Sequence, residues 1–151
     1  MGSNRDPLAS VTGGVDPSGA RASKPVKVLL ADDHAEFRAG LGEMLSIDGG
    51  IEVVGEAENG WEALALVGEV RPDVVVLDLA MPLVGGQEAA RLILGEASPP
   101  PGVVVLTMHA TPRLRRELLG SGVSAFLAKS ASLAEIVAAV KDACPAPWGV
   151  P

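Results

Sequence analysis

Five short runs of apolar residues constrain the fold of this chain more than any other feature. Each run is rich in β-branched side chains and bounded by Gly, Pro or Asp, which is typical of strands. The predicted strands are Val26–Ala31, Ile51–Ala57, Asp73–Asp78, Val103–Thr107 and Val123–Ala128. Two of them are apolar at successive positions, at Val74–Leu77 and Val103–Leu106. That pattern indicates strands covered on both faces, as in a parallel sheet flanked by helices.

Segments with apolar side chains at helical spacing alternate with these runs. The predicted helices are Glu36–Leu45, Trp61–Val70, Gln87–Leu94, Pro112–Leu119 and Leu133–Ala143. Ser132 and Glu135 have the spacing of a capping box at the start of the last helix. Strands that alternate with helices predict a doubly wound α/β fold, and right-handed crossovers limit its topology.

Composition excludes several classes of protein. A net charge of -7 argues against a segment that grips nucleic acid through its phosphates, because that task needs a basic face. Cys144 is the only cysteine, so an internal disulfide is excluded, in keeping with a cytoplasmic location. No apolar run reaches the ~20 residues that cross a bilayer, and no secretory signal is evident, so no membrane association is expected.

The distribution of small and polar residues predicts one folded unit between two tails. Residues 1–24 are expected to be a disordered N-terminal tail or an added extension, because they cannot bury enough apolar surface to offset ordering. Residues 25–144 form the predicted domain, and residues 145–151 are expected to be a short C-terminal linker stub.

Polar side chains lie at or just after the carboxyl ends of four of the five predicted strands. In an open parallel sheet, ligands bind beyond the carboxyl ends of the strands. The residues there are Asp32, Asp33, Asp78, Thr107 and Lys129. Clustered carboxylates repel one another unless a cation intervenes, and Mg²⁺ is suited to such oxygen ligands. A carboxylate can also attack phosphorus while a metal ion and an amine neutralise the phosphoryl oxygens. The pattern therefore predicts Mg²⁺-dependent phosphoryl chemistry.

The order and spacing of these motifs resemble the receiver domain of bacterial two-component response regulators. The resemblance runs from Lys27 to about Ala143 and rests on Val28–His34, Pro72–Asp78, Met81-Pro82, Gly86, Val105–Thr107 and Lys129. It implies a flavodoxin-like, CheY-like, five-stranded parallel sheet in the order 2-1-3-4-5. Ala31–His34 and Leu106–His109 are similar to the subfamily whose full-length members carry a C-terminal LuxR/NarL-type helix-turn-helix. No such motif fits after Ala143.

The resemblance also implies the roles of the site residues. Asp78 would accept a phosphoryl group, and Mg²⁺ would be held by Asp32, Asp33, Asp78 and the backbone carbonyl of Ala80. Lys129 would bind the phosphoryl group, Thr107 would move to hydrogen-bond it, and Phe126 would then turn inward. The residues expected to modulate the lifetime of the phosphate are Ala80, Met108 and His109.

Some positions depart from the common family pattern or have an uncertain part in it. Ser130 follows Lys129 where Pro is typical, which leaves open whether the bond between them is cis. Met108 stands where a small residue is common and is expected to narrow access to Asp78. His34 is expected to open the first helix rather than to act as a ligand, since no partner is visible at ligand spacing.

The function implied is that of a signalling switch rather than an enzyme. A sensor histidine kinase would be the phosphoryl donor, and a partner surface or a homodimer would be the output. DNA would be contacted only through a C-terminal domain absent from this chain, and whether the chain is a truncated regulator or a stand-alone receiver stays open.

Three alternatives remain. The chain could be a degenerate receiver that acts as a phosphorylation-independent interaction module. A Mg²⁺-dependent phosphohydrolase of similar fold is disfavoured because Ala80 occupies the place of its second acid. A nucleotide or flavin binder is disfavoured because Asp32–Ala35, and not a glycine-rich loop, follows the first strand.

Overall fold

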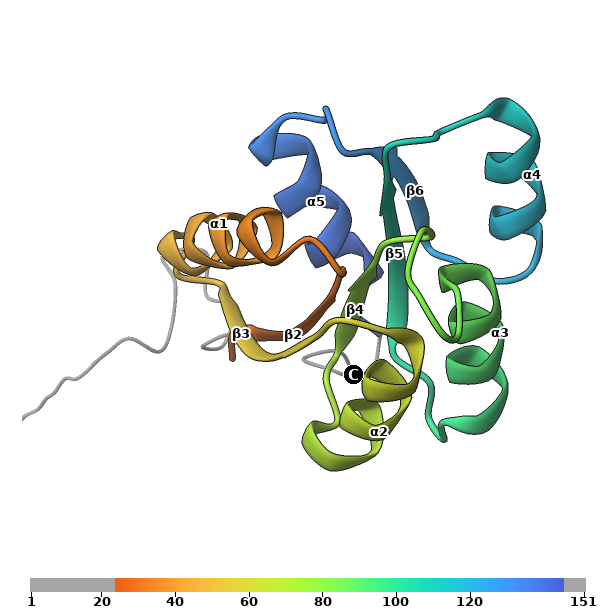
Figure 1. The fold of residues 1–151 in the computed structure, drawn as a ribbon. Coiled ribbons are helices and arrows are strands. Elements are labelled where there is room, and N and C mark those ends of the chain that lie inside the picture. The colour runs from red at the N-terminus through yellow and green to blue at the C-terminus, as the bar shows by residue number, and fades with distance from the viewer. Residues whose placement is uncertain (1–23, 146–151) are drawn as a thin grey trace, which may run out of the picture.

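The structure is a computed structural model that describes residues 24–145 (Figure 1). The predicted N-terminal tail and C-terminal stub therefore lie outside the described residues, apart from Lys24 and Pro145. Strands and helices alternate along the described chain as β2 (Val26–Ala31), α1 (Ala35–Ile47), β3 (Ile51–Ala57), α2 (Gly60–Val70), β4 (Val74–Leu77), α3 (Gly86–Glu96), β5 (Gly102–Thr107), α4 (Pro112–Gly120), β6 (Ala125–Ala128) and α5 (Leu133–Ala143). Among these helices, none is long and apolar enough to span a bilayer.

The strands form one parallel sheet in the order β3-β2-β4-β5-β6. Numbered along the chain, this is the order 2-1-3-4-5, so the predicted doubly wound topology is confirmed. β4 lies at the centre, with Val75 paired to Leu29 of β2 and to Val103 of β5. All four of its residues are buried, as the unbroken apolar run predicts.

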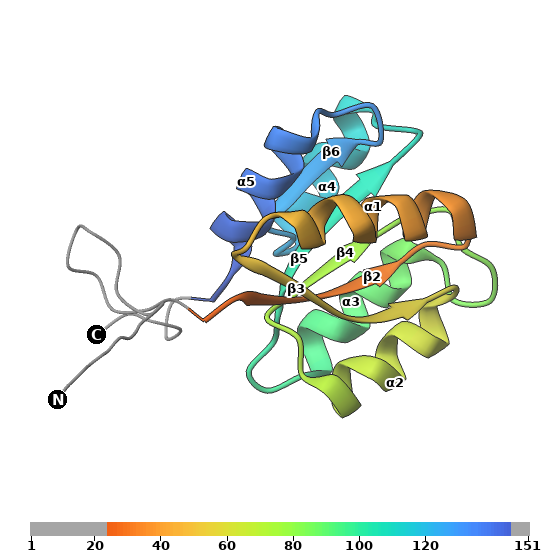
Figure 2. The ribbon, with the colours of Figure 1, turned by 90° about the vertical axis from the view of Figure 1, so that its left-hand side faces the viewer.

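Two hydrophobic layers cover the two faces of the sheet, and Figure 2 shows helices on both sides of it. On one face α1 and α5 pack through Leu41, Leu45, Ile136, Val140 and Ala143. On the other face α2, α3 and α4 pack through Ala63, Val67, Ala89, Ala90, Ile93 and Leu118. Neighbouring residues of β4 and β5 point to opposite layers, which explains why each successive position had to be apolar.

The ends of some elements differ from the predicted ones. β6 begins at Ala125 rather than Val123, because Val123 belongs to the turn that terminates α4. Gly122 has a φ of 109°, and the N–H groups of Gly122 and Val123 donate to the carbonyls of Leu119 and Leu118. This is the Schellman arrangement, in which a left-handed glycine ends a helix. β4 is one residue shorter than predicted at each end, and β5 begins one residue earlier.

Helix ends agree with the predicted ones within two residues, and α5 agrees at both ends. The predicted capping box of α5 is present, since the Ser132 side chain accepts from the Glu135 N–H and the Glu135 side chain accepts from the Ser132 N–H. α1 begins after His34, which stands at its N-cap as predicted.

Candidate functional site

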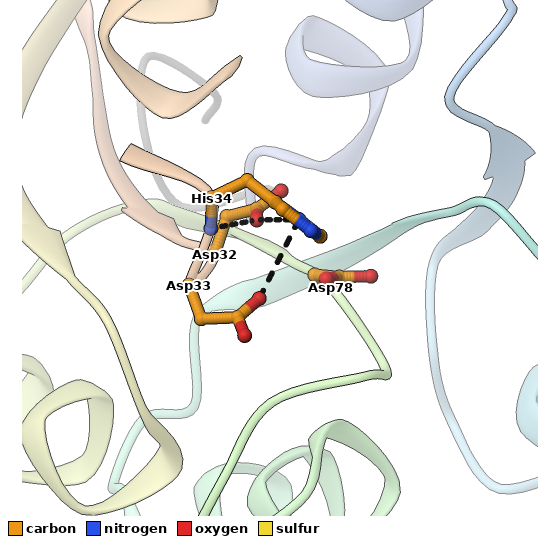
Figure 3. Close-up of side chains that lie close together, drawn as sticks. All are labelled: Asp32, Asp33, His34 and Asp78. Atoms are coloured by element: carbon orange, nitrogen blue, oxygen red, sulfur yellow. Dashed lines mark hydrogen bonds and ion pairs between the residues drawn. The ribbon is translucent and has the colours of Figure 1, made fainter. Parts of the chain in front are cut away.

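Four potential ligand groups meet at the carboxyl ends of β2 and β4 (Figure 3). Asp32, Asp33 and His34 follow β2, and Asp78 follows β4. One ligand atom from each residue lies within 4.8 Å of the others. Asp32 and Asp78 are buried, whereas Asp33 and His34 are exposed to solvent. The sheet edge therefore brings the three predicted carboxylates together, and a histidine with them.

Backbone hydrogen bonds between neighbouring strands fix these side chains in place. The Asp78 N–H donates to the Ala31 carbonyl at 2.9 Å, and the Asp32 N–H donates to the Ala57 carbonyl at 2.9 Å. Both acids thus extend the sheet by one rung past the last strand residue. Arg38 of α1 donates from Nη1 to the Asp32 carbonyl and from Nε to a Glu56 carboxylate oxygen, which ties α1 to the end of β3.

Lys129 brings a positive charge into the cluster. Its Nζ lies 2.7 Å from Asp32 Oδ2 and 3.5 Å from Asp78 Oδ2, and its side chain is only 5% exposed. The same ammonium lies 4.5 Å from the centre of the Phe37 ring, in cation–π contact. The Lys129 N–H donates to the Thr107 carbonyl at 2.8 Å, which carries the lysine past the end of β6. Lys129 is thus a buried partner of the acids and not a solvated surface charge.

The peptide bond after Lys129, whose isomer the sequence left open, is trans. Within residues 24–145, the one cis bond joins Ser98 to Pro99.

The surroundings of Asp78 raise the pKa of its carboxyl above the ordinary value. Burial and the nearby Asp32 charge raise the pKa of the Asp78 carboxyl, while Lys129 and the Ala80 N–H act in the opposite direction. Asp78 Oδ2 is buried and has no hydrogen-bond partner among the described residues. The Lys129 ammonium is paired with two carboxylates, a third from Asp33 lies in the same cluster, and the buried Asp78 Oδ2 has no hydrogen bond among the described residues. These residues fit a hard divalent cation with oxygen ligands.

The other predicted site residues lie around this cluster. Thr107 ends β5, is buried, and its hydroxyl accepts a hydrogen bond from the His109 N–H at 3.2 Å. It therefore caps the following turn, the local role that a threonine at a strand end commonly takes. Met108 is 70% exposed, and His109 and Ala80 are exposed in their loops.

Phe126 already points inward. It is 3% exposed and packs in the layer under α2, α3 and α4, and its carbonyl accepts a hydrogen bond from Arg115 Nη1 at 3.0 Å. The inward turn that the resemblance implies on phosphorylation would thus start from an aromatic ring that is already buried.

A close approach of two backbones holds the loop after Asp78 in position. A Cβ added at Gly86, the first residue of α3, would lie 2.2 Å from the Asp78 carbonyl oxygen and 2.4 Å from Leu79 Cα. The Gly86 N–H also donates to the Leu79 carbonyl at 3.0 Å. Glycine is needed here because only its backbone can lie this close to that of the acid.

Sequence reasoning missed three contributors to the site. Phe37 and Arg38 lie inside the predicted helix Glu36–Leu45, where apolar and basic side chains are common and carry no signal of a site. His34 was expected to be without ligand partners, but its Nδ1 lies 3.2 Å from Asp32 Oδ1 and 3.5 Å from Asp33 Oδ1. Its position directly after two acids at a strand end was the signal that could have indicated this.

Comparison with known proteins agrees with the geometry. Residues 28–141 match the response regulator receiver domain family. Over 116 residues the chain is 40% identical to the response regulator GacA of Pseudomonas syringae pv. syringae, covering 77% of this chain and 54% of GacA. It is 38% identical over 117 residues to the probable transcriptional regulatory protein NarL of Mycobacterium tuberculosis, covering 78% of this chain and 54% of NarL. The chain thus spans about half the length of the curated relatives it matches.

Solved structures show the same architecture. The signal receiver domain of NarL from Mycobacterium tuberculosis is 37% identical and superposes with a TM-score of 0.74, over 79% of this chain and 95% of that one. A LuxR-family response regulator from Aurantimonas is 33% identical with a TM-score of 0.74, over 79% and 84% of the two chains. On these grounds, the chain belongs to the response regulator receiver domain family, the signalling switches of two-component systems.

Proposed function

We propose that the chain is a phosphorylation switch whose acceptor is the Asp78 carboxylate. The observation that carries the proposal is the state of that carboxylate. It is buried, one of its oxygens has no hydrogen-bond partner among the described residues, and the Lys129 ammonium lies 3.5 Å from that oxygen. A buried carboxylate oxygen without a hydrogen bond is costly in a purely structural site, and a cation beside it is useful in a site that receives a phosphoryl group.

The chemistry follows from the positions of these residues. An Asp78 oxygen attacks phosphorus, the bond from phosphorus to the donor breaks, and the donor atom leaves with the electron pair of that bond. Lys129 can follow the charge from the carboxylates to the new phosphoryl oxygens, because its Nζ already lies between Asp32 and Asp78. A positive charge that already lies beside the reacting oxygen stabilises the negative charge that develops in the transition state.

Asp32, Asp33 and Asp78, with the Ala80 backbone carbonyl, would hold Mg²⁺. When bound, this ion would neutralise phosphoryl oxygens during transfer. Asp32 also has two structural roles in the site. Asp32 holds Lys129 in place through the 2.7 Å ion pair, and it anchors the start of α1 by accepting the His34 N–H at 2.8 Å.

Thr107 and Phe126 would transmit the change. The Thr107 hydroxyl accepts only the His109 N–H among the described residues, so it can turn to donate to a phosphoryl oxygen at the cost of one 3.2 Å bond. That movement would alter the packing of Phe126 and the surface of α4, β6 and α5. The expected donor is a sensor histidine kinase, with homodimer formation as one output. The longer relatives named as transcriptional regulators favour transcription control through a DNA-binding domain outside this chain.

The test is phosphorylation by acetyl phosphate, with and without Mg²⁺, read by intact mass. The parent should gain one phosphoryl group only with Mg²⁺, and Asp78→Asn should gain none. Asp142→Asn is the matched control, because Asp142 is an exposed acid on α5, and it should behave as the parent does. No gain in the parent from acetyl phosphate or from a histidine kinase would reject the proposal in favour of a phosphorylation-independent interaction module.

A further inference from the structure

We propose that His34 is a metal ligand in this site, and that the site therefore prefers a borderline transition-metal ion such as Co²⁺ to Mg²⁺. The inference rests on the proposed function only for the place where the cation binds. It concerns a residue of this chain that the predicted set of oxygen ligands does not include.

The geometry places the imidazole nitrogen where a ligand has to be. His34 Nδ1 is 3.2 Å from Asp32 Oδ1 and 3.5 Å from Asp33 Oδ1, and Figure 3 shows the ring directed toward these carboxylates. Adjacent ligands on an octahedral ion are about 3 Å apart when each bond is about 2.1 Å. With Asp78, the four ligand atoms lie within 4.8 Å of one another. Small adjustments of side chains suffice to surround one ion.

A second observation indicates that the cluster is built for positive charge. Asp78 Oδ2 is buried beside these groups without a hydrogen-bond partner in residues 24–145. The Lys129 ammonium lies 2.7 Å from Asp32 Oδ2, 3.5 Å from Asp78 Oδ2 and 3.3 Å from His34 Nδ1, so its single charge is set against a cluster that holds three carboxylates. A divalent ion would balance the remaining negative charge.

The His34 side chain has no helix-capping or core-packing role that competes with ligation. It stands at the N-cap of α1, yet its side chain makes no capping hydrogen bond. Its backbone N–H, and not its ring, holds the turn by donating to Asp32 Oδ1 at 2.8 Å. The side chain is 61% exposed, so its removal leaves no cavity in the core. The backbone thus orients the ring, and the contacts that Nδ1 makes are with Asp32, Asp33 and Lys129, the same groups that a bound ion would rearrange.

A nitrogen ligand among oxygen ligands changes which metal ions the site binds most tightly. Carboxylate and carbonyl oxygens suit Mg²⁺, whereas an imidazole nitrogen suits transition metals and adds little for Mg²⁺. Affinities at a mixed nitrogen and oxygen site rise from Mn²⁺ to Co²⁺ and Ni²⁺. Loss of His34 should therefore weaken Co²⁺ binding by about tenfold or more and leave Mg²⁺ binding nearly unchanged.

The experiment measures the binding of Mg²⁺, Mn²⁺ and Co²⁺ to the untagged, metal-stripped chain by calorimetry. The variants are His34→Ala, Asp33→Asn and His109→Ala, and circular dichroism checks that each is folded. His109 is the matched control because it is the other histidine and is exposed. We expect His34→Ala to weaken Co²⁺ strongly, Mn²⁺ less and Mg²⁺ hardly at all, Asp33→Asn to weaken all three ions, and His109→Ala to change none.

A spectroscopic readout tests ligation directly. Pulsed electron paramagnetic resonance of the Mn²⁺-loaded parent should show a coupled ¹⁴N nucleus that is lost in His34→Ala and kept in His109→Ala. If His34→Ala binds Co²⁺ as the parent does and the ¹⁴N coupling is unchanged, this inference is overturned and the proposed phosphorylation stands. If the parent binds no divalent ion, this inference fails together with the metal dependence of the proposed function.

Discussion

Replacing Gly86 by alanine should damage both the stability of the fold and the position of Asp78. The added Cβ would lie 2.2 Å from the Asp78 carbonyl oxygen, 2.4 Å from Leu79 Cα and 2.9 Å from the Asp78 carbonyl carbon. These are backbone atoms, which cannot swing aside as the end of a flexible side chain would. Because Gly86 has no positive φ, the obstacle to alanine is space and not backbone conformation.

The magnitude follows from two opposing effects. Alanine in a helix is more stable than glycine by roughly 0.5–1 kcal/mol. Overpacking against fixed atoms costs typically 1–3 kcal/mol. Because the contacts of 2.2–2.9 Å are with backbone atoms, the cost should lie near its upper end, and we expect Gly86→Ala to lower the free energy of unfolding by about 2 kcal/mol. Gly95→Ala, in the same helix, meets nothing within 4 Å and should raise it by up to about 1 kcal/mol.

The assay is urea unfolding followed by far-ultraviolet circular dichroism. The unfolding midpoint of Gly86→Ala should fall by roughly 1–2 M, and that of Gly95→Ala should rise slightly. Under conditions where Gly86→Ala is folded, its phosphorylation by acetyl phosphate should also be slower than that of the parent, because α3 and the loop before it are pushed away from Asp78. A Gly86→Ala variant as stable as the parent would refute this reasoning.

Three further predictions concern other parts of the structure. Ser132→Ala removes one half of the capping box with Glu135 and should lower the free energy of unfolding by about 1 kcal/mol in the same urea assay, whereas no change would mean that the cap is not stabilising. Burial raises the pKa of the Cys144 thiol to about 11. Alkylation by iodoacetamide should therefore be slow at pH 8 and become faster toward pH 11, because the thiolate is the reactive form. Fast alkylation at pH 8 would contradict the raised pKa. Burial and the Asp32 charge raise the pKa of Asp78, so ionisation of its carboxyl opposes folding when no divalent ion is present. Asp78→Asn should then unfold at a higher urea concentration than the parent at pH 7 in EDTA. The difference between the two midpoints should shrink as the pH falls and the parent carboxyl becomes protonated. A difference that grows at low pH would contradict this reasoning.

Most of the fold could be predicted because its signals are local. The unbroken apolar runs of β4 and β5 can only be satisfied by a sheet covered on both faces, and the alternation with helices leaves few topologies. The capping box of α5 is a local pattern, so the start of that helix could be predicted from the sequence and is found in the structure. The start of β6 could not be predicted because Val123 has strand-like chemistry, and the left-handed Gly122 that assigns it to a turn is a tertiary feature.

The candidate site, like the fold, has parts that could be predicted from local sequence and parts that could not. Strand ends are visible in sequence, so the acids, Thr107 and Lys129 could be placed at one edge of the sheet. The contacts that arise across the fold could not. Lys129 is 92 positions from Phe37 and 95 from His34, and no local pattern indicates that its ammonium lies over the ring of one and beside the nitrogen of the other.

The central claim is that Asp78, and no other acid of the cluster, receives the phosphoryl group. The most direct measurement is to phosphorylate the parent with acetyl phosphate and Mg²⁺, reduce the acyl phosphate with borodeuteride, and locate the label by tandem mass spectrometry. Label at position 78 is the predicted result. Label at Asp32 or Asp33, or a phosphorylated chain with no label at Asp78, would contradict the account.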